Sequence, residues 1–198
     1  MKTKRVKIKQ LLKLNLLRSK VYEQPIKKIK FDNLIDANLN QIITDIKKAL
    51  QIIFHYNKVE KRILFVGLPQ KFELKINRFT RHVAVPKIFE VQGIISTNNL
   101  KSFKNSYQPW LKDCSSFLLP KLTKKLDLIV LFEHEKSKTV LSEAESMRIP
   151  LISFGTDLNL ENKALYSVEG NFRNGLTVSD RNIFFIGLNF LFKNSKKK

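Results

Sequence analysis

The chain has 198 residues, of which 43% are hydrophobic, and its 37 lysines and arginines outnumber its 17 aspartates and glutamates by 20. The hydrophobic fraction is ordinary for a folded protein and excludes wholesale disorder, and the single cysteine, Cys114, excludes an internal disulfide and a cysteine-built zinc site. The positive charge predicts a polyanionic partner, because unneutralised like charges repel each other; nucleic acid is the first expectation and an anionic membrane surface the second.

The positive charge is concentrated at the two ends of the chain. Residues 1–30 hold 11 basic residues and one acidic residue, and residues 193–198 hold four more lysines, which leaves a net charge of +6 for residues 31–192. We therefore expect a basic N-terminal extension over 1–35, a single α/β domain over 36–192 and a basic C-terminal tail over 193–198. Basic ends of this density either lie in solvent or bind phosphates, and we favour phosphate binding.

The N-terminal third of the chain contains one strong helical pattern. Residues 1–35 mix lysine with leucine and isoleucine without a clean period, so only a short helix over 11–17 is expected, and Pro25 would interrupt a longer one. Over 36–57 the apolar residues fall on one helical stripe, and Asp36 is the expected N-cap. The residues of the stripe are Leu39, Ile42, Ile43, Ile46, Ala49, Leu50 and Ile53.

The next part of the chain predicts alternating strands and helices. A strand is expected over 62–66, a helix over 69–79 and a short strand over 82–85. Residues 87–125 show no readable pattern. The run DLIVLF at 127–132 is continuously apolar, as a strand buried on both faces requires.

After this buried strand the alternation continues to the end of the chain. We expect a helix over 136–148, strands over 150–154 and 165–168, and a last helix over 179–192. The first of these helices should face inward with Val140, Leu141, Ala144 and Met147. The last helix is apolar nearly all round, so it must be covered on more than one side. Its apolar run over 182–192 is too short to span a membrane, which takes about 20 residues.

Strands that alternate with helices predict right-handed crossovers and a parallel sheet. The expected fold is therefore a three-layer α/β/α domain with a mainly parallel sheet, of the flavodoxin or Rossmann type.

The end of the first strand, RILFVGLPQ at 62–70, poses the question of nucleotide binding. A loop that holds phosphate needs several glycines, so that backbone N–H groups can reach the oxygens. Here Gly67 stands alone and Pro69 lacks an N–H group, so we interpret Gly67 as a turn residue and Pro69 as the start of the next helix. The alternative function is a nucleotide-binding α/β enzyme with its site at the strand ends near Gly67 and Glu133.

The sequence gives little support for any other catalytic or metal-binding site. Glu133, His134 and Glu135 follow a buried strand, but neighbours in sequence do not generally converge on one metal ion, so a solvated turn is expected. Asp157 has no identifiable partner, and no serine has a recognisable base. We therefore predict no catalytic residue, no cofactor, no metal and no small-molecule substrate.

Basic residues interspersed with turn residues fill 71–104, and they form either a solvated surface or a surface that follows a phosphate backbone. Together with the two basic ends they give the predicted RNA contacts. These are Lys2, Lys4, Arg5, Lys7, Lys9, Lys13, Arg18, Lys20, Lys27, Lys28, Lys30, Arg78, Arg81, Lys101, Lys104, Lys196, Lys197 and Lys198.

Three segments, in this order, resemble a known family. They are RILFVGLP at 62–69, GIISTN at 93–98 and DLIVLFEHEKSKTVLSEAESMRIPLISFGTD at 127–157. They resemble the universal small-subunit ribosomal protein two family, in which KILFVGTK, GGMLTN and PDALFVID are followed by a helix containing EA, by GIPV and by a DTN turn. Here EA is Glu143-Ala144, and EGN at 169–171 resembles the family's PGN. The resemblance covers roughly 35–192.

Departures from the family indicate a divergent member. The glycine- and histidine-rich N-terminal signature of bacterial members is absent, and the space between 98 and 127 implies that the family's projecting helical hairpin is shortened or lost. Lysine, asparagine, isoleucine and phenylalanine are abundant, as in AT-rich genomes, so the sequence looks like that of a mitochondrial member. The resemblance implies a non-enzymatic constituent of the small subunit of the mitochondrial ribosome in the matrix, in contact with rRNA and neighbouring ribosomal proteins.

Overall fold

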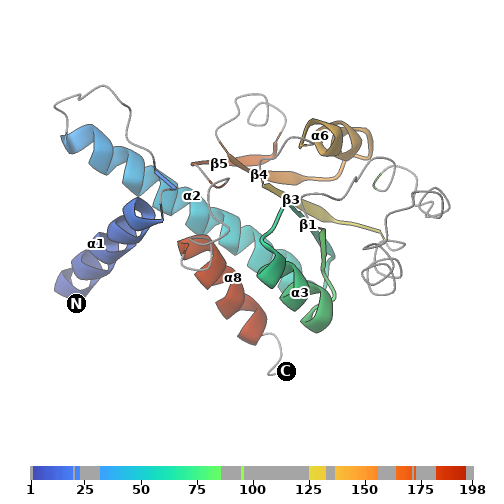
Figure 1. Ribbon diagram of the computed structural model, residues 1–198, viewed down its shortest axis with the longest axis horizontal. Helices are drawn as coiled ribbons and strands as arrows, with labels where there is room; N and C mark the ends of the chain where they lie inside the picture. Colours follow the sequence, from blue (N-terminus) through green and yellow to red (C-terminus); the bar gives the residue numbers. More distant parts are fainter. Residues whose placement is uncertain are drawn as a thin grey trace.

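The computed structural model describes residues 2–19, 21–22, 32–85, 95, 125–132, 137–155, 164–170, 172 and 182–194. Its centre is a sheet of five parallel strands in the order β2-β1-β3-β4-β5 (Figure 1). The strands are β1 (Ile63–Val66), β2 (Val83–Val85), β3 (Leu128–Phe132), β4 (Leu151–Gly155) and β5 (Tyr166–Glu169). This sheet confirms the predicted α/β class of flavodoxin or Rossmann type. The predicted loss of the projecting hairpin, over 99–126, lies almost entirely outside the described residues.

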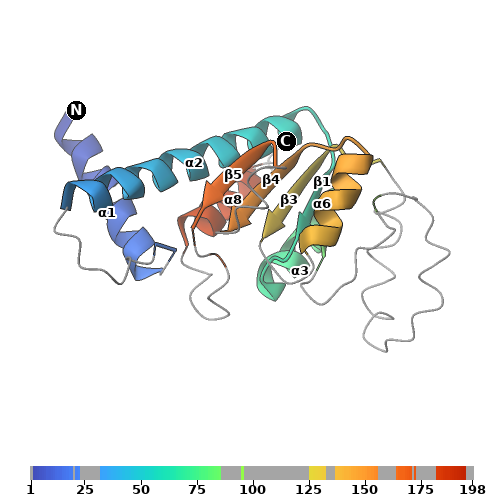
Figure 2. The same ribbon diagram turned by 90° about the horizontal axis from the view of Figure 1, so that it is seen from above.

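Helices cover both faces of the sheet (Figure 2). On one face lie α2 (Asp32–Lys58), α3 (Gln70–Phe79) and α8 (Ile183–Asn194), and on the other lies α6 (Ser137–Ser146). Alternate residues of β1 enter the two cores, with Phe65 on the side of α2 and Leu64 on the side of α6. Strands buried on both faces have no polar side to expose, which explains why β1, β2 and β3 are continuously apolar; β4 buries one polar residue, Ser153.

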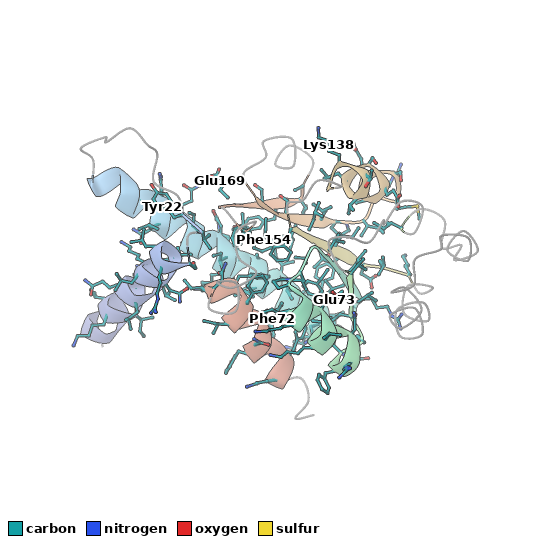
Figure 3. All side chains as sticks on the ribbon, in the orientation of Figure 1. Tyr22, Phe72, Glu73, Lys138, Phe154 and Glu169 are labelled. Atoms are coloured by element: carbon teal, nitrogen blue, oxygen red, sulfur yellow. The ribbon has the colours of Figure 1, made fainter. Side chains whose placement is uncertain are left out.

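The core beneath α8 is rich in aromatic rings. Phe154 of β4 lies at the centre of the domain (Figure 3), with its ring centroid 4.5 Å from that of Phe184 and 4.8 Å from that of Phe132. Phe72 of α3 stacks on Phe185 of α8 at 4.7 Å. These contacts fix α3 and α8 on the same face of the sheet.

The apolar stripe predicted for the long helix is confirmed, but its start is not. Five of the seven stripe residues are buried, and Ile43 and Leu50 pack half-buried against them. The helix begins at Asp32, so Asp36 lies inside it and is not the N-cap. No proline or glycine lies between 32 and 36, so nothing in the sequence stops the helix from extending by one turn.

Two expectations about the later helices also need correction. Val140, Leu141 and Ala144 are buried as predicted, but Met147 is 40% exposed, because α6 ends at Ser146 and the chain turns through Arg148 at φ 53°. The last helix buries one side only. Phe184, Phe185 and Leu188 are buried, whereas Ile186 and Phe190 are more than half exposed. The expected cover on several sides is therefore incomplete within the described residues.

The N-terminal helix α1 (Lys2–Arg18) is longer than the short segment predicted over 11–17. Lysine, arginine, glutamine and leucine all favour helices, and residues 2–18 contain neither glycine nor proline. The C-terminal end of α1 joins the main core, where Leu16 and Val21 are buried. Gly170, at φ 148°, allows this approach, since a Cβ there would lie 2.9 Å from the Val21 side chain.

Candidate nucleic-acid interface

Helix α1 carries the densest positive charge of the described residues. It holds seven basic residues and no acidic residue in 17 positions. The end that contains Leu16 packs against α2 and α8, whereas the N-terminal end points away from the sheet (Figures 1 and 2). The fold thus holds one end of a basic helix and presents the other to the surroundings.

Charged and apolar side chains are mixed around α1. Lys7, Lys9 and Arg18 are exposed, and so are large apolar side chains from Val6 to Leu14. These residues do not separate into a basic and an apolar face, because helical periodicity distributes both kinds around the axis. A flat membrane surface would bury one apolar face only, and α1 offers no such face. None of the helices in the described ranges is long and apolar enough to cross a membrane.

A second basic surface lies on α3, on the other side of α8 from α1 (Figure 1). Lys71, Lys75 and Arg78 are exposed at the i, i+4 and i+7 positions of α3 and therefore share one side of the helix. The predicted residue Arg81 follows the helix, and its Nη1 lies 3.4 Å from Oε1 of Glu60 in an exposed ion pair. Such a pair contributes little to stability and leaves the guanidinium at the surface.

The remaining predicted contacts are only partly described. Lys2, Lys4 and Arg5 lie in α1, without a description of their side chains, and Lys13 is half-buried in the same helix. Nine others lie outside the described residues: Lys20, Lys27, Lys28, Lys30, Lys101, Lys104, Lys196, Lys197 and Lys198. The structure therefore brings together the predicted residues of α1 and, separately, Arg78 and Arg81.

The strand ends that would hold a nucleotide lie at the switch point of the sheet, between β1 and β3, whose crossovers leave on opposite faces. Gly67 has φ 83°, which confirms its role as a turn residue, and its N–H donates to the carbonyl oxygen of Val85 at 3.2 Å. Leu68 is buried, and Pro69 has no N–H group to offer. The N–H of Gly67 is therefore already hydrogen-bonded within the sheet, and position 69 has no N–H that could bind a phosphate.

The other residues considered for chemistry add no site within the described ranges. Glu133, His134, Glu135 and Asp157 lie outside them, as does Cys114. Among the residues that the structure describes, no group of three or more His, Cys, Asp or Glu side chains could hold a metal ion.

Glu73, in the first turn of α3, is a buried carboxyl group that the sequence pattern does not predict. Glu73 lies beside the sheet (Figure 3) and is only 4% exposed. Burial raises the pKa of Glu73 to about 7, because the carboxylate loses its hydration. One sequence feature is consistent with this burial. Glu73 follows Phe72 and lies one helical turn before Ile76, and both of these apolar residues are buried, as is Asn77.

Two further buried polar side chains stabilise the edge of the sheet. Asn77 donates from Nδ2 to the carbonyl oxygen of Ala84 and accepts from its N–H, both at 2.8 Å, so α3 closes the outer edge of β2. His82 accepts the N–H of Ile63 at Nδ1, 3.3 Å away, and its Nε2 lies 3.0 Å from Oδ1 of Asn57. His82 is therefore a neutral structural histidine with the proton on Nε2.

At the opposite edge a polar contact joins α2 to β5. The phenol of Tyr166 donates to Oδ1 of Asp45 at 2.7 Å, and Nζ of Lys48 lies 3.8 Å from the same oxygen. Burial and the hydrogen bond to Asp45 raise the pKa of Tyr166 above its usual value. Like Asn77 and His82, this cluster serves the packing of the domain.

No known protein-family model matches the chain, and comparison with curated proteins finds no significant match.

Proposed function

We propose that this protein is a structural, RNA-binding constituent of the small ribosomal subunit, a divergent mitochondrial member of the universal small-subunit ribosomal protein two family. The observation that carries the proposal is α1, which bears seven basic and no acidic residues and is held by the core at one end only. Basic side chains that enter rRNA release counterions from its phosphates, and this release drives binding.

The positions of the family-like segments support the proposal. The segment over 62–69 forms β1 and its turn at Gly67. Ile95, from GIISTN, donates its N–H to Oε2 of Glu143, from the EA pair, at 3.1 Å, so two segments that are 48 residues apart meet in the fold. Gly170, from EGN, lies where residues 21 and 172 approach the backbone. The glycines at 67 and 170 have positive φ, and Glu143 supplies a side-chain acceptor, so parts of these segments lie at turns and contacts between elements of the fold.

The geometry of the strand ends also favours binding over catalysis. A nucleotide would need backbone donors after β1, and Gly67 uses its N–H within the sheet while Pro69 has none. The domain then acts as a folded platform for basic segments, and the proposed partners are small-subunit rRNA and the ribosomal proteins beside it. The proposed location is the mitochondrial matrix.

Sedimentation tests the assignment first. The chain should travel with small ribosomal subunits of mitochondria at moderate salt and should crosslink to their rRNA. If it sediments as free protein in the matrix, the ribosomal assignment is wrong.

Charge neutralisation then tests the role of α1. Replacement of the exposed Lys7, Lys9 and Arg18 by glutamine should weaken RNA binding and reduce the slope of log affinity against log salt by about 2 to 3. The matched control replaces the exposed Lys47, Lys58 and Lys138, which removes the same charge from α2 and α6. Equal losses in both variants would show that net charge, and not α1, governs binding.

A further inference from the structure

A groove separates α3 from α8 on the face of the sheet that carries both helices. Its cavity volume is about 240 Å³, and its lining includes Phe72 and Ile76 from α3 and Leu188 and Phe192 from α8. Lys75 stands on the α3 side and Lys193 on the α8 side. The Lys75 ammonium lies 5.5 Å from the centroid of the Phe72 ring, so the charge is held over the apolar lining.

The charge at this groove has one sign. Helix α8 contains no acidic residue, and the acid of α3, Glu73, is buried and does not line the groove. Both walls therefore offer cations beside an apolar surface. Phe79, which also lines the groove, is 58% exposed and extends this apolar surface outward.

An apolar centre with a polar rim is the usual composition of a protein-binding surface. We propose that the groove binds an acidic segment of a partner protein, which inserts a leucine or phenylalanine side chain between α3 and α8 and places carboxylates beside Lys75 and Lys193. The inference rests on the groove alone, so it can fail independently of the ribosomal assignment.

The chemistry of the lining favours a peptide over a nucleobase. Besides the lysines, the polar groups that line the groove are Thr80 and Asn189. The hydroxyl of Thr80 donates to the carbonyl oxygen of Ile76 at 2.8 Å and accepts the N–H of His82 at 3.2 Å, so it already has partners. A buried base would find hydrogen-bond partners only in Asn189 and the two lysines and would leave its other polar ring atoms unpaired, which is costly, whereas a leucine or phenylalanine side chain buries no polar group.

The test uses the full chain with labelled isoleucine and leucine methyl groups, so that Ile76 and Leu188 report on the groove. Three probes are titrated: a short helical peptide with leucine and phenylalanine on one side and glutamates beside them, the same peptide with lysine in place of each glutamate, and single-stranded oligouridylate. The acidic peptide should shift the Ile76 and Leu188 signals and bind about tenfold more tightly than its basic twin. Oligouridylate should leave these two signals in place.

Variants distinguish binding at the groove from attraction by the overall positive charge of the protein. Lys75→Glu combined with Lys193→Glu should weaken the acidic peptide about tenfold or more, and Lys47→Glu with Lys58→Glu, the same charge change on α2, should not. Asn189→Phe should fill the groove and abolish binding while the thermal transition stays in place. Neutralising Lys7, Lys9 and Arg18 should spare peptide binding even if it removes RNA binding.

Four results would overturn the proposal. They are no shift with the acidic peptide, equal binding of its basic twin, equal losses in the α2 control, and displacement of the Ile76 and Leu188 signals by oligouridylate alone. The last result would identify the groove as a nucleotide site.

Discussion

Replacement of Glu73 by glutamine should make the protein more stable at neutral pH. Glutamine has nearly the shape of the protonated carboxyl group, so it keeps the packing of a side chain that is only 4% exposed. The substitution removes the carboxylate, which the wild-type protein must bury as a charge when Glu73 ionises. The N-terminal position of Glu73 on α3 favours the carboxylate through the helix dipole by about 0.3–1 kcal/mol, but burial raises its pKa to about 7, so the loss of hydration is the larger effect.

The size and sign of the pH effect on the free energy of unfolding follow from the pKa of Glu73 in the folded and unfolded states. The pKa of Glu73 is about 7 in the folded protein against 4.5 for an ordinary glutamate. Each pKa unit corresponds to about 1.4 kcal/mol, so the free energy of unfolding should fall by up to about 3 kcal/mol as the pH rises. Below pH 4.5 Glu73 is protonated in both the folded and the unfolded protein, so it does not make the free energy of unfolding depend on pH. Between 4.5 and about 7 the unfolded chain loses the proton that the folded protein keeps, and stability decreases with rising pH.

Urea unfolding followed by far-ultraviolet circular dichroism, at a series of pH values from 4 to 8.5, measures this directly. The glutamine variant should match the wild type near pH 4 and exceed it by up to about 3 kcal/mol at pH 8. Glu145→Gln on α6, an exposed glutamate, is the matched control for the added net charge. A difference between variant and wild type that does not depend on pH, or a variant that is less stable at pH 8, would refute the reasoning.

Four other substitutions test the internal polar contacts and two glycines. Asn77→Ala removes both hydrogen bonds to Ala84; we expect a loss of about 2 kcal/mol in urea unfolding and, because the edge of β2 opens, faster aggregation in light scattering. His82→Ala leaves a cavity and an unpaired N–H at Ile63, so the loss should be about 3 kcal/mol, and rescue by added imidazole would be consistent with this cause. Gly170→Ala should cost about 1–3 kcal/mol, because its φ is positive and a Cβ there would lie 2.9 Å from the side chains of Val21 and Phe172, while Gly187→Ala, which meets only the flexible side chain of Leu50, should cost less. Equal effects of the two glycine substitutions would contradict the backbone argument.

The sheet and its main helices were predictable because burial on both faces leaves an unambiguous pattern. The apolar runs of β1, β3 and β4 have no polar alternation, and the stripe on α2 follows the helical period over several turns. Gly67 was also predictable as a turn residue, since a glycine that ends a buried strand has few other uses. In each case a local pattern and the tertiary fold require the same residue type.

The remaining features depend on contacts that a local pattern does not contain. Glu73 is buried because its neighbours Phe72 and Ile76 enter the core, and only the fold determines which polar neighbours turn inward with them. The extent of α1 was missed because its apolar residues follow no period, and its anchor is a single residue, Leu16, with the turn at Val21. The helical period places Met147 in the core only if it continues past Ser146, the residue where α6 ends.

The distribution of polar contacts separates the part of the chain that folds from the part that we expect to bind. Several polar side chains of the domain form hydrogen bonds within it, namely those of Asn77, His82 and Tyr166. These groups stabilise the fold and are not available to a partner. Six of the seven basic residues of α1 precede its anchor at Leu16, and like charges repel one another in the free protein. Their removal should therefore leave the free energy of unfolding unchanged or slightly higher while it weakens binding to RNA, and a loss of both would mean that the basic end of α1 belongs to the folding unit.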